Sequence, residues 1–180
     1  MPMAATTKVW TLDELHSLPD DGNKYELVRG ELLVTPTPTN NHEEIAARLS
    51  ALLTPYVAAH RLGYVLHPRA IVRYDGSEVE PDLMVRAAHG RGDWDDAPLP
   101  LLIVEVASPA TRRRDRAQKR EFYLAASIAE YWIVDPEART VTVARRGMDD
   151  VVARESVTWS PKAAAEPLEI AVSGLFGEAY

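Results

Sequence analysis

The sequence predicts an α/β protein in which helices flank a central mixed β-sheet. Segments with the apolar spacing of helices alternate along the chain with short apolar runs typical of strands. Residues 101–106 form the most apolar run, which predicts a central strand covered on both faces. The chain has no internal repeat, low-complexity segment or linker, so a single domain over residues 1–180 is the simplest organisation.

The N-terminal part, residues 8–35, is expected to hold a helix and a hairpin. Thr11 and Glu14 form a capping-box pattern that opens a short helix ending near Pro19. Residues 25–28 and 31–34 flank Arg29-Gly30, a pattern typical of a tight β-hairpin.

The core is expected over residues 40–145. A helix begins near Asn40 or Asn41 and carries an apolar stripe of Ile45, Leu49, Leu52, Leu53 and Tyr56. Beyond it the sequence predicts strands at 64–66, 70–74, 79–85, 101–106, 131–134 and 140–144, an exposed loop at 87–100 and a helix over about 112–126. In the C-terminal part, residues 150–180, the segments 151–152 and 168–172 could add edge strands.

Composition limits the possible functions. The formal net charge of −7 argues against a general nucleic-acid coat, because phosphate binding depends on Lys and Arg. The absence of cysteine excludes disulfides and thiolate sites. No apolar run could cross a bilayer and no signal-peptide pattern is present, so we expect a soluble cytoplasmic protein with no membrane partner.

Although the chain is acidic overall, it contains one local run of basic residues. It comprises Arg112, Arg113, Arg114, Arg116, Lys119 and Arg120. Such a run could grip a phosphate backbone or could be a solvated helix face, and charge alone leaves both interpretations open.

Glu105 is the residue that most needs a physical explanation. It interrupts an otherwise apolar predicted strand and shares a strand face with Ile103 and Ala107. Burying a lone carboxylate costs several kcal/mol, so a cation, a metal ion or a position at the edge of a cleft is expected nearby. A buried ion pair with an arginine is the structural alternative.

Asp82 acquires meaning from Glu105. Pro81-Asp82 alone is a common turn dipeptide, and Pro81 suits the start or edge of a strand. Two carboxylates at the ends of adjacent strands, however, can share a hard cation such as Mg²⁺. A metal held there lowers the pKa of a bound water and offsets charge on a phosphoryl group.

Several stretches together resemble the Uma-two family of restriction endonucleases, a branch of the PD-(D/E)xK superfamily. They follow the family's order and are residues 25–32, 81–83, 104–111, Asp115 with Lys119 and Tyr123, and 130–136. The resemblance implies a restriction-endonuclease-like core: a mixed sheet flanked by helices.

The same resemblance implies an active site. Asp82 and Glu105 become the metal ligands, and Glu31 the upstream acidic residue, although Glu26 on the same hairpin competes for that role. The lysine usually stands two residues after the glutamate, where this chain has Ala107. Lys119 on the following helix is then the relocated lysine, which could orient or deprotonate a water and stabilise the phosphate. His42 fits the family pattern as a helix cap or supporting group rather than a ligand.

These residues predict an endonuclease that uses Mg²⁺ or Mn²⁺ to hydrolyse phosphodiester bonds, with DNA as the expected partner. Cutting both strands would need two sites, which makes a homodimer plausible, but no stretch identifies an interface. The alternative is a nuclease scaffold that performs no chemistry and serves as a binding or regulatory module. The acidic net charge and the lack of a separate DNA-reading domain favour that alternative somewhat.

Overall fold

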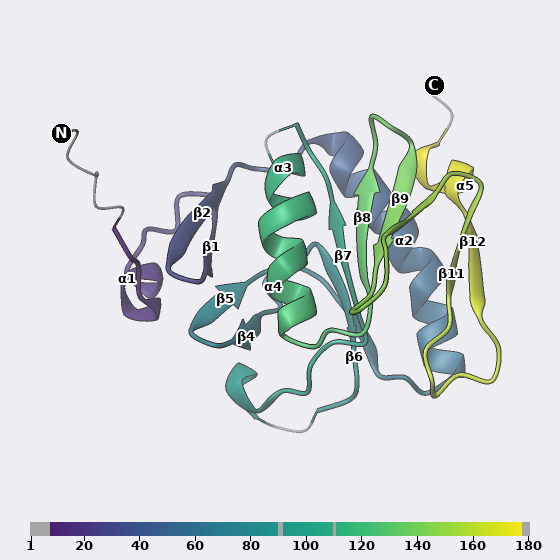
Figure 1. Ribbon diagram of the computed structural model, residues 1–180, viewed down its shortest axis with the longest axis horizontal. Coiled ribbons are helices and arrows are strands. Elements are labelled where there is room, and N and C mark those ends of the chain that lie inside the picture. The colour runs from purple at the N-terminus through teal and green to yellow at the C-terminus, as the bar shows by residue number, and fades with distance from the viewer. Residues whose placement is uncertain (1–7, 90–91, 110, 178–180) are drawn as a thin grey trace.

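The computed structural model, which describes residues 8–89, 92–109 and 111–177, contains a six-stranded mixed sheet (Figure 1). Strands β7 and β8 are parallel, and every other neighbouring pair in this sheet is antiparallel. The predicted α/β class with a mixed sheet is therefore confirmed. In order across the sheet, the strands are β10 (Val151–Ala153), β9 (Thr140–Ala144), β8 (Tyr131–Asp135), β7 (Leu102–Val106), β6 (Leu83–Arg86) and β3 (Tyr64–Leu66).

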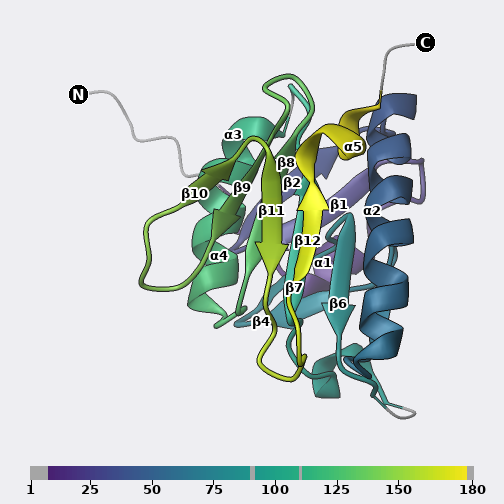
Figure 2. The same cartoon turned by 90° about the vertical axis from the view of Figure 1, so that its right-hand side faces the viewer.

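Helices cover the two faces of this sheet (Figures 1 and 2). On one face lies α2 (Asn40–Ala59), whose buried residues pack on Leu102, Val104 and Val106 of β7. On the other lies a continuous helical segment of α3 (Arg112–Arg114), the π-helical turn η2 (Asp115–Lys119) and α4 (Arg120–Ala125). The expected apolar stripe on α2 needs one correction. Leu52 is exposed, whereas Val57, one turn after the buried Leu53, is buried.

A second, four-stranded sheet has the order β2-β1-β5-β4. The predicted hairpin is present as β1 (Lys24–Val28) and β2 (Glu31–Thr35), and it pairs through β1 with β5 (Ser77–Val79), which in turn pairs with β4 (Val72–Tyr74).

The expected single strand over 79–85 is wrong. The chain leaves the four-stranded sheet after Val79 and enters the six-stranded sheet only at Leu83. Pro81 has no N–H to offer to a ladder, so the change of sheet happens where backbone pairing is already weakened. Asp82 consequently lies at the junction of the two sheets.

The remaining elements surround this frame. The capping box of Thr11 and Glu14 is present at the start of α1 (Leu12–His16), and the predicted loop over 87–100 contains only the short turn η1 (Trp94–Asp96) among its described residues. β10 is an edge strand, as expected. The other expected edge strand is β12 (Leu168–Ala171), but it pairs with β11 (Ser156–Trp159) in a separate ribbon, and Val172 already begins α5 (Val172–Phe176). Within the described residues, no helix combines the length and apolarity needed to cross a membrane.

Candidate active site

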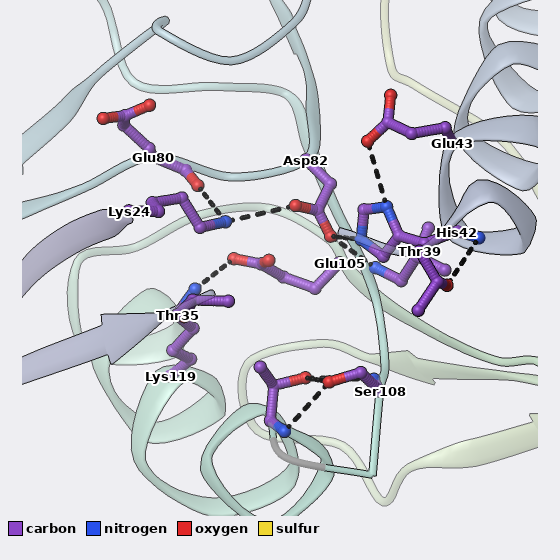
Figure 3. A network of polar contacts seen from close by, with 12 residues as sticks. Lys24, Thr35, Thr39, His42, Glu43, Glu80, Asp82, Glu105, Ser108 and Lys119 are labelled. Carbon is purple, nitrogen blue, oxygen red and sulfur yellow. Dashed lines mark hydrogen bonds and ion pairs between the residues drawn. The ribbon is translucent and has the colours of Figure 1, made fainter. Parts of the chain in front are cut away.

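A cleft of about 660 Å³ opens where the two sheets meet. Asp82, Glu105 and Lys119 line it, and so do His42 and Lys24 (Figure 3). Its walls come from the segment that follows β2 and from the loop that precedes β4, namely residues 35–39 and 67–69. The structure therefore brings the two expected carboxylates and the expected lysine to one place.

The pairing of β6 with β7 places Asp82 beside Glu105. Leu83 lies opposite Val104 in this antiparallel pair, and Asp82 and Glu105 are the next residues along the two chains beyond that pair. The backbone N–H of Val106 donates to Asp82 Oδ2 at 2.8 Å, so the aspartate side chain extends the ladder beyond the paired backbone.

Glu105 is buried, with 2% of its surface exposed. Its Oε1 accepts hydrogen bonds from Lys119 Nζ and from the hydroxyl of Tyr123, both at 2.8 Å. Its Oε2 accepts none from the described residues. Burial raises the pKa of Glu105 to about 8. The cation that the apolar strand led us to expect is thus a lysine, not an arginine, and one carboxylate oxygen is left for a further partner.

Lys119 is as buried as the carboxylate it contacts. It ends the π-turn η2, and such turns are frequent at functional sites because they change which side chains share a helix face. Burial disfavours the charged ammonium, but the carboxylates of Glu105, Glu26 and Asp115 outweigh burial and hold the pKa of Lys119 well above its usual value. Lys119 is therefore a charged hydrogen-bond donor.

Glu26, and not Glu31, is the hairpin carboxylate in this cluster. Lys119 Nζ lies 2.8 Å from Glu26 Oε2, and the backbone N–H of Glu80 donates to Glu26 Oε1 at 2.9 Å. Burial opposes ionisation of Glu26, yet the charges of Lys119 and Lys24 hold its pKa below the usual value. Glu31 begins the edge strand β2, is exposed, and accepts a hydrogen bond from Gln118, so its expected place in the site is wrong.

Asp82 contacts two basic side chains, His42 and Lys24. His42 Nε2 lies 2.9 Å from Asp82 Oδ2, and Lys24 Nζ lies 3.1 Å from Asp82 Oδ1 (Figure 3). Burial opposes the charge on Asp82, but Lys24 and His42 outweigh it and hold the pKa of Asp82 well below its usual range. His42 follows the N-cap Thr39 and supports Asp82 from the start of α2, as the sequence pattern suggested.

Sequence reasoning missed Lys24. It is the first residue of β1, and nothing in the local pattern distinguishes it from an exposed hairpin lysine. Only the crossing of the two sheets brings it to Asp82.

Most of the basic run is engaged inside the protein. Arg112 and Arg116 contact Asp135, and Arg120 contacts Asp150. Arg114 donates to backbone and side-chain oxygens of residues 34 and 35. Arg113 is the exposed member of the run for which the described residues supply no ion pair. The run is therefore mainly a set of structural ion pairs.

The donor set suits a hard divalent cation held by few protein ligands. Asp82 supplies carboxylate oxygens from just before β6 and Glu105 from the adjacent strand β7, and Glu105 Oε2 is without a hydrogen bond from the described residues. No group of three or more His, Asp or Glu side chains among those residues could by itself surround a metal. Mg²⁺ commonly binds through one or two carboxylates and keeps several waters, so two carboxylates are compatible with it.

The sequence matches the family described as "Putative restriction endonuclease" (Uma2) over residues 12–173. The chain belongs to this family. A crystal structure from Anabaena variabilis, described as a "putative nuclease belonging to DUF820", superimposes with a TM-score of 0.77 at 21% identity and covers 93% of this chain and 97% of that one. At this identity, the similarity to that structure shows the shared fold. None of the curated proteins matches the sequence.

The Uma2 family assignment agrees with a site made of Asp82, Glu105 and Lys119 at the junction of the two sheets. Family and fold together point to a restriction-endonuclease-like nuclease.

Proposed function

We propose that this Uma2 protein is an endonuclease that hydrolyses phosphodiester bonds in DNA with Mg²⁺ or Mn²⁺. One observation carries the proposal: Asp82, which immediately precedes β6, and Glu105 of the neighbouring strand β7 line one cleft, and the Lys119 ammonium contacts Glu105 in the same cleft. Two oxygen donors beside one fixed positive charge suit a reaction in which negative charge builds up on a phosphoryl group.

Asp82 and Glu105 would hold the metal ion. Bound there, the ion would supply a water of lowered pKa and an electrostatic partner for the phosphoryl oxygens. His42 and the Val106 N–H orient Asp82 from two sides, so that its carboxylate enters the cleft in one fixed position. Tyr123 does the same for Glu105 from α4.

Lys119 would act by its charge and its hydrogen bonds. Its raised pKa keeps the ammonium protonated, which favours orienting the attacking water and stabilising the phosphate over removing a proton. Glu26 is a positioning residue in this scheme, because its carboxylate holds the same ammonium that contacts Glu105.

The test is cleavage of supercoiled plasmid by the purified protein with Mg²⁺ or Mn²⁺, and with neither. We expect metal-dependent nicking that Asp82→Asn, Glu105→Gln and Lys119→Met each reduce by about 100-fold or more, since the first two weaken a proposed metal ligand and the third removes the charge that would stabilise the phosphate. Circular dichroism shows whether each variant is folded. Cleavage that survives Glu105→Gln would overturn the mechanism.

A catalytically silent module is the second candidate, because most cations of the basic run are paired internally and the net charge is −7. Such a module would neither bind a metal ion nor cleave nucleic acid, whereas the nuclease would do both. The plasmid assay, together with calorimetric titration of Mn²⁺, separates the two.

A further inference from the structure

Lys24 is a cation of the cleft that contacts a proposed metal ligand and that the scheme above leaves without a role. Its Nζ donates to Asp82 Oδ1 at 3.1 Å and to the carbonyl oxygen of Glu80 at 3.0 Å. The side chain is 19% exposed, so it is held at the edge of the cleft rather than extended into solvent. Its ammonium therefore has a fixed place on one of the two proposed metal ligands (Figure 3).

The remaining contacts of Asp82 show which oxygen Lys24 controls. Oδ2 accepts from the backbone N–H of Val106 and lies against His42 Nε2. Lys24 is the partner of Oδ1 among the described residues. An ion that binds Asp82 through Oδ1 would meet the ammonium at close range. Like charges that lie within a few ångströms of each other and are partly shielded from water repel strongly, so the ammonium would oppose the ion's binding to Oδ1.

A second reason for Lys24 lies in the charge balance of the metal-free cluster. Glu26, Asp82 and Glu105 crowd three buried carboxyl groups into one region, and all three lie near Lys119 or Lys24. Lys119 contacts Glu26 and Glu105 but makes no hydrogen bond to Asp82. Without a metal, Lys24 supplies on Oδ1, beside His42 on Oδ2, the counter-charge that Lys119 does not give to Asp82.

We propose that Lys24 competes with the divalent ion for Asp82 and thereby sets the metal concentration at which the ion occupies the site. This inference rests on the proposed metal-dependent function. In the metal-free protein its ammonium neutralises Asp82 and stabilises the junction of the sheets. When the ion binds, the ammonium leaves Oδ1 for the open side of the cleft. Metal binding is then an exchange of one cation for another.

The direct test is calorimetric titration of Mn²⁺ into metal-free protein. Lys24→Met removes the charge and retains most of the side-chain volume, whereas Lys24→Arg keeps the charge. Lys162→Met is the matched control, because Lys162 is exposed and the substitution changes the net charge equally. We expect the Mn²⁺ dissociation constant of Lys24→Met to fall about tenfold or more, with both other variants within about twofold of wild type.

Thermal unfolding supplies a second readout of the same exchange. Lys24→Met should melt at a lower temperature than wild type without metal, and Mn²⁺ should raise its melting temperature by more than it raises that of wild type. Unchanged or weaker Mn²⁺ binding by folded Lys24→Met would overturn the role of Lys24 while leaving the metal site intact. Absence of Mn²⁺ binding by both wild type and Lys24→Met would overturn the metal-dependent function and this inference with it.

The wild-type protein provides a test that needs no variant to fold. Reductive methylation with formaldehyde and cyanoborohydride modifies accessible amines, and mass spectrometry reads each lysine separately. We expect Mn²⁺ to increase the methylation rate of Lys24 severalfold and to leave that of Lys162 unchanged. An unchanged rate at Lys24 under saturating Mn²⁺ would mean that the ammonium stays on Asp82 and would overturn the exchange.

Discussion

Two buried carboxylates on neighbouring parallel strands have opposite surroundings. Glu105 lies near the end of β7 and Asp135 ends β8, and each is 2% exposed. Asp135 contacts the guanidinium groups of Arg112 and Arg116 and also accepts backbone N–H groups of the turn that follows β8. Glu105 receives two donors on a single oxygen and lines the cleft.

The difference between the two carboxylates lies in their hydrogen-bond partners and not in their burial. Both oxygens of Asp135 are engaged by donors, and the side chain is not part of the cleft lining. Its arginine partners also reach solvent, since 48% of the Arg116 side chain is exposed, whereas Lys119 beside Glu105 is only 3% exposed. Asp135 links the helical segment that carries Arg112 and Arg116 to the turn that follows β8. Among the residues that the structure describes, none donates to the second oxygen of Glu105, so this oxygen beside the Lys119 ammonium is available to a metal ion or a reacting group.

The largest expected effect is a difference between Glu105 and Asp135 in how their substitution changes plasmid cleavage. Glu105→Gln should reduce plasmid cleavage by about 1000-fold, because a ligand oxygen is replaced by an amide that binds a divalent cation poorly. Its free energy of unfolding should change by less than about 1 kcal/mol, since the amide keeps the shape and the acceptor oxygen of a carboxyl group whose pKa is already raised. Cleavage rates and urea denaturation at neutral pH measure the two quantities.

Asp135→Asn should behave in the opposite way. It removes the counter-charge of two arginines and should lower the free energy of unfolding by about 1–3 kcal/mol. Cleavage per folded molecule should stay within about twofold of wild type, because Asp135 lies outside the cleft. Equal losses of activity in the two variants would remove the distinction between the two carboxylates.

The next expected effect compares Lys119, the cation that contacts Glu105, with Arg116, a cation that contacts Asp135. Lys119→Met leaves the buried carboxylate of Glu26 without its ammonium and the carboxyl group of Glu105 without one of its two hydrogen-bond donors, which should cost about 3–5 kcal/mol of unfolding free energy in the metal-free protein. Arg116→Met should cost about 0–1 kcal/mol, because solvent already screens that half-exposed ion pair. Urea denaturation of both variants in the presence of a chelator makes the comparison, and similar costs would contradict it.

How far the sequence alone could predict this site depends on how local each signal is. The apolar run around Glu105 is local, so a carboxylate in need of a partner could be recognised from the sequence. The hairpin, the helix bearing Lys119 and the strand after it were predicted for the same reason. The break at Pro81 was missed because residues 79–85 look like one strand, and only the presence of two sheets divides them.

The choice between Glu26 and Glu31 could not be made from the sequence, and the register explains why. Glu26 pairs with Leu33 and Glu31 pairs with Val28, so both glutamates point to the same face of the hairpin. The helical segment η2 crosses that face, with Lys119 contacting Glu26 and the preceding Gln118 contacting Glu31. Position along the hairpin, set by where this helix crosses, decides which glutamate is buried.

The smallest expected effect tests that choice. Glu26→Gln removes one of the two carboxylates that hold Lys119 and should slow cleavage by about 10- to 100-fold, mainly in kcat, because the ammonium is less well positioned. Glu31→Gln should change cleavage by less than about twofold, since an exposed side chain bonded to Gln118 has no contact with Lys119. A larger loss from Glu31→Gln than from Glu26→Gln would mean that the exposed glutamate acts on the substrate, and that the buried one only balances the charge of Lys119.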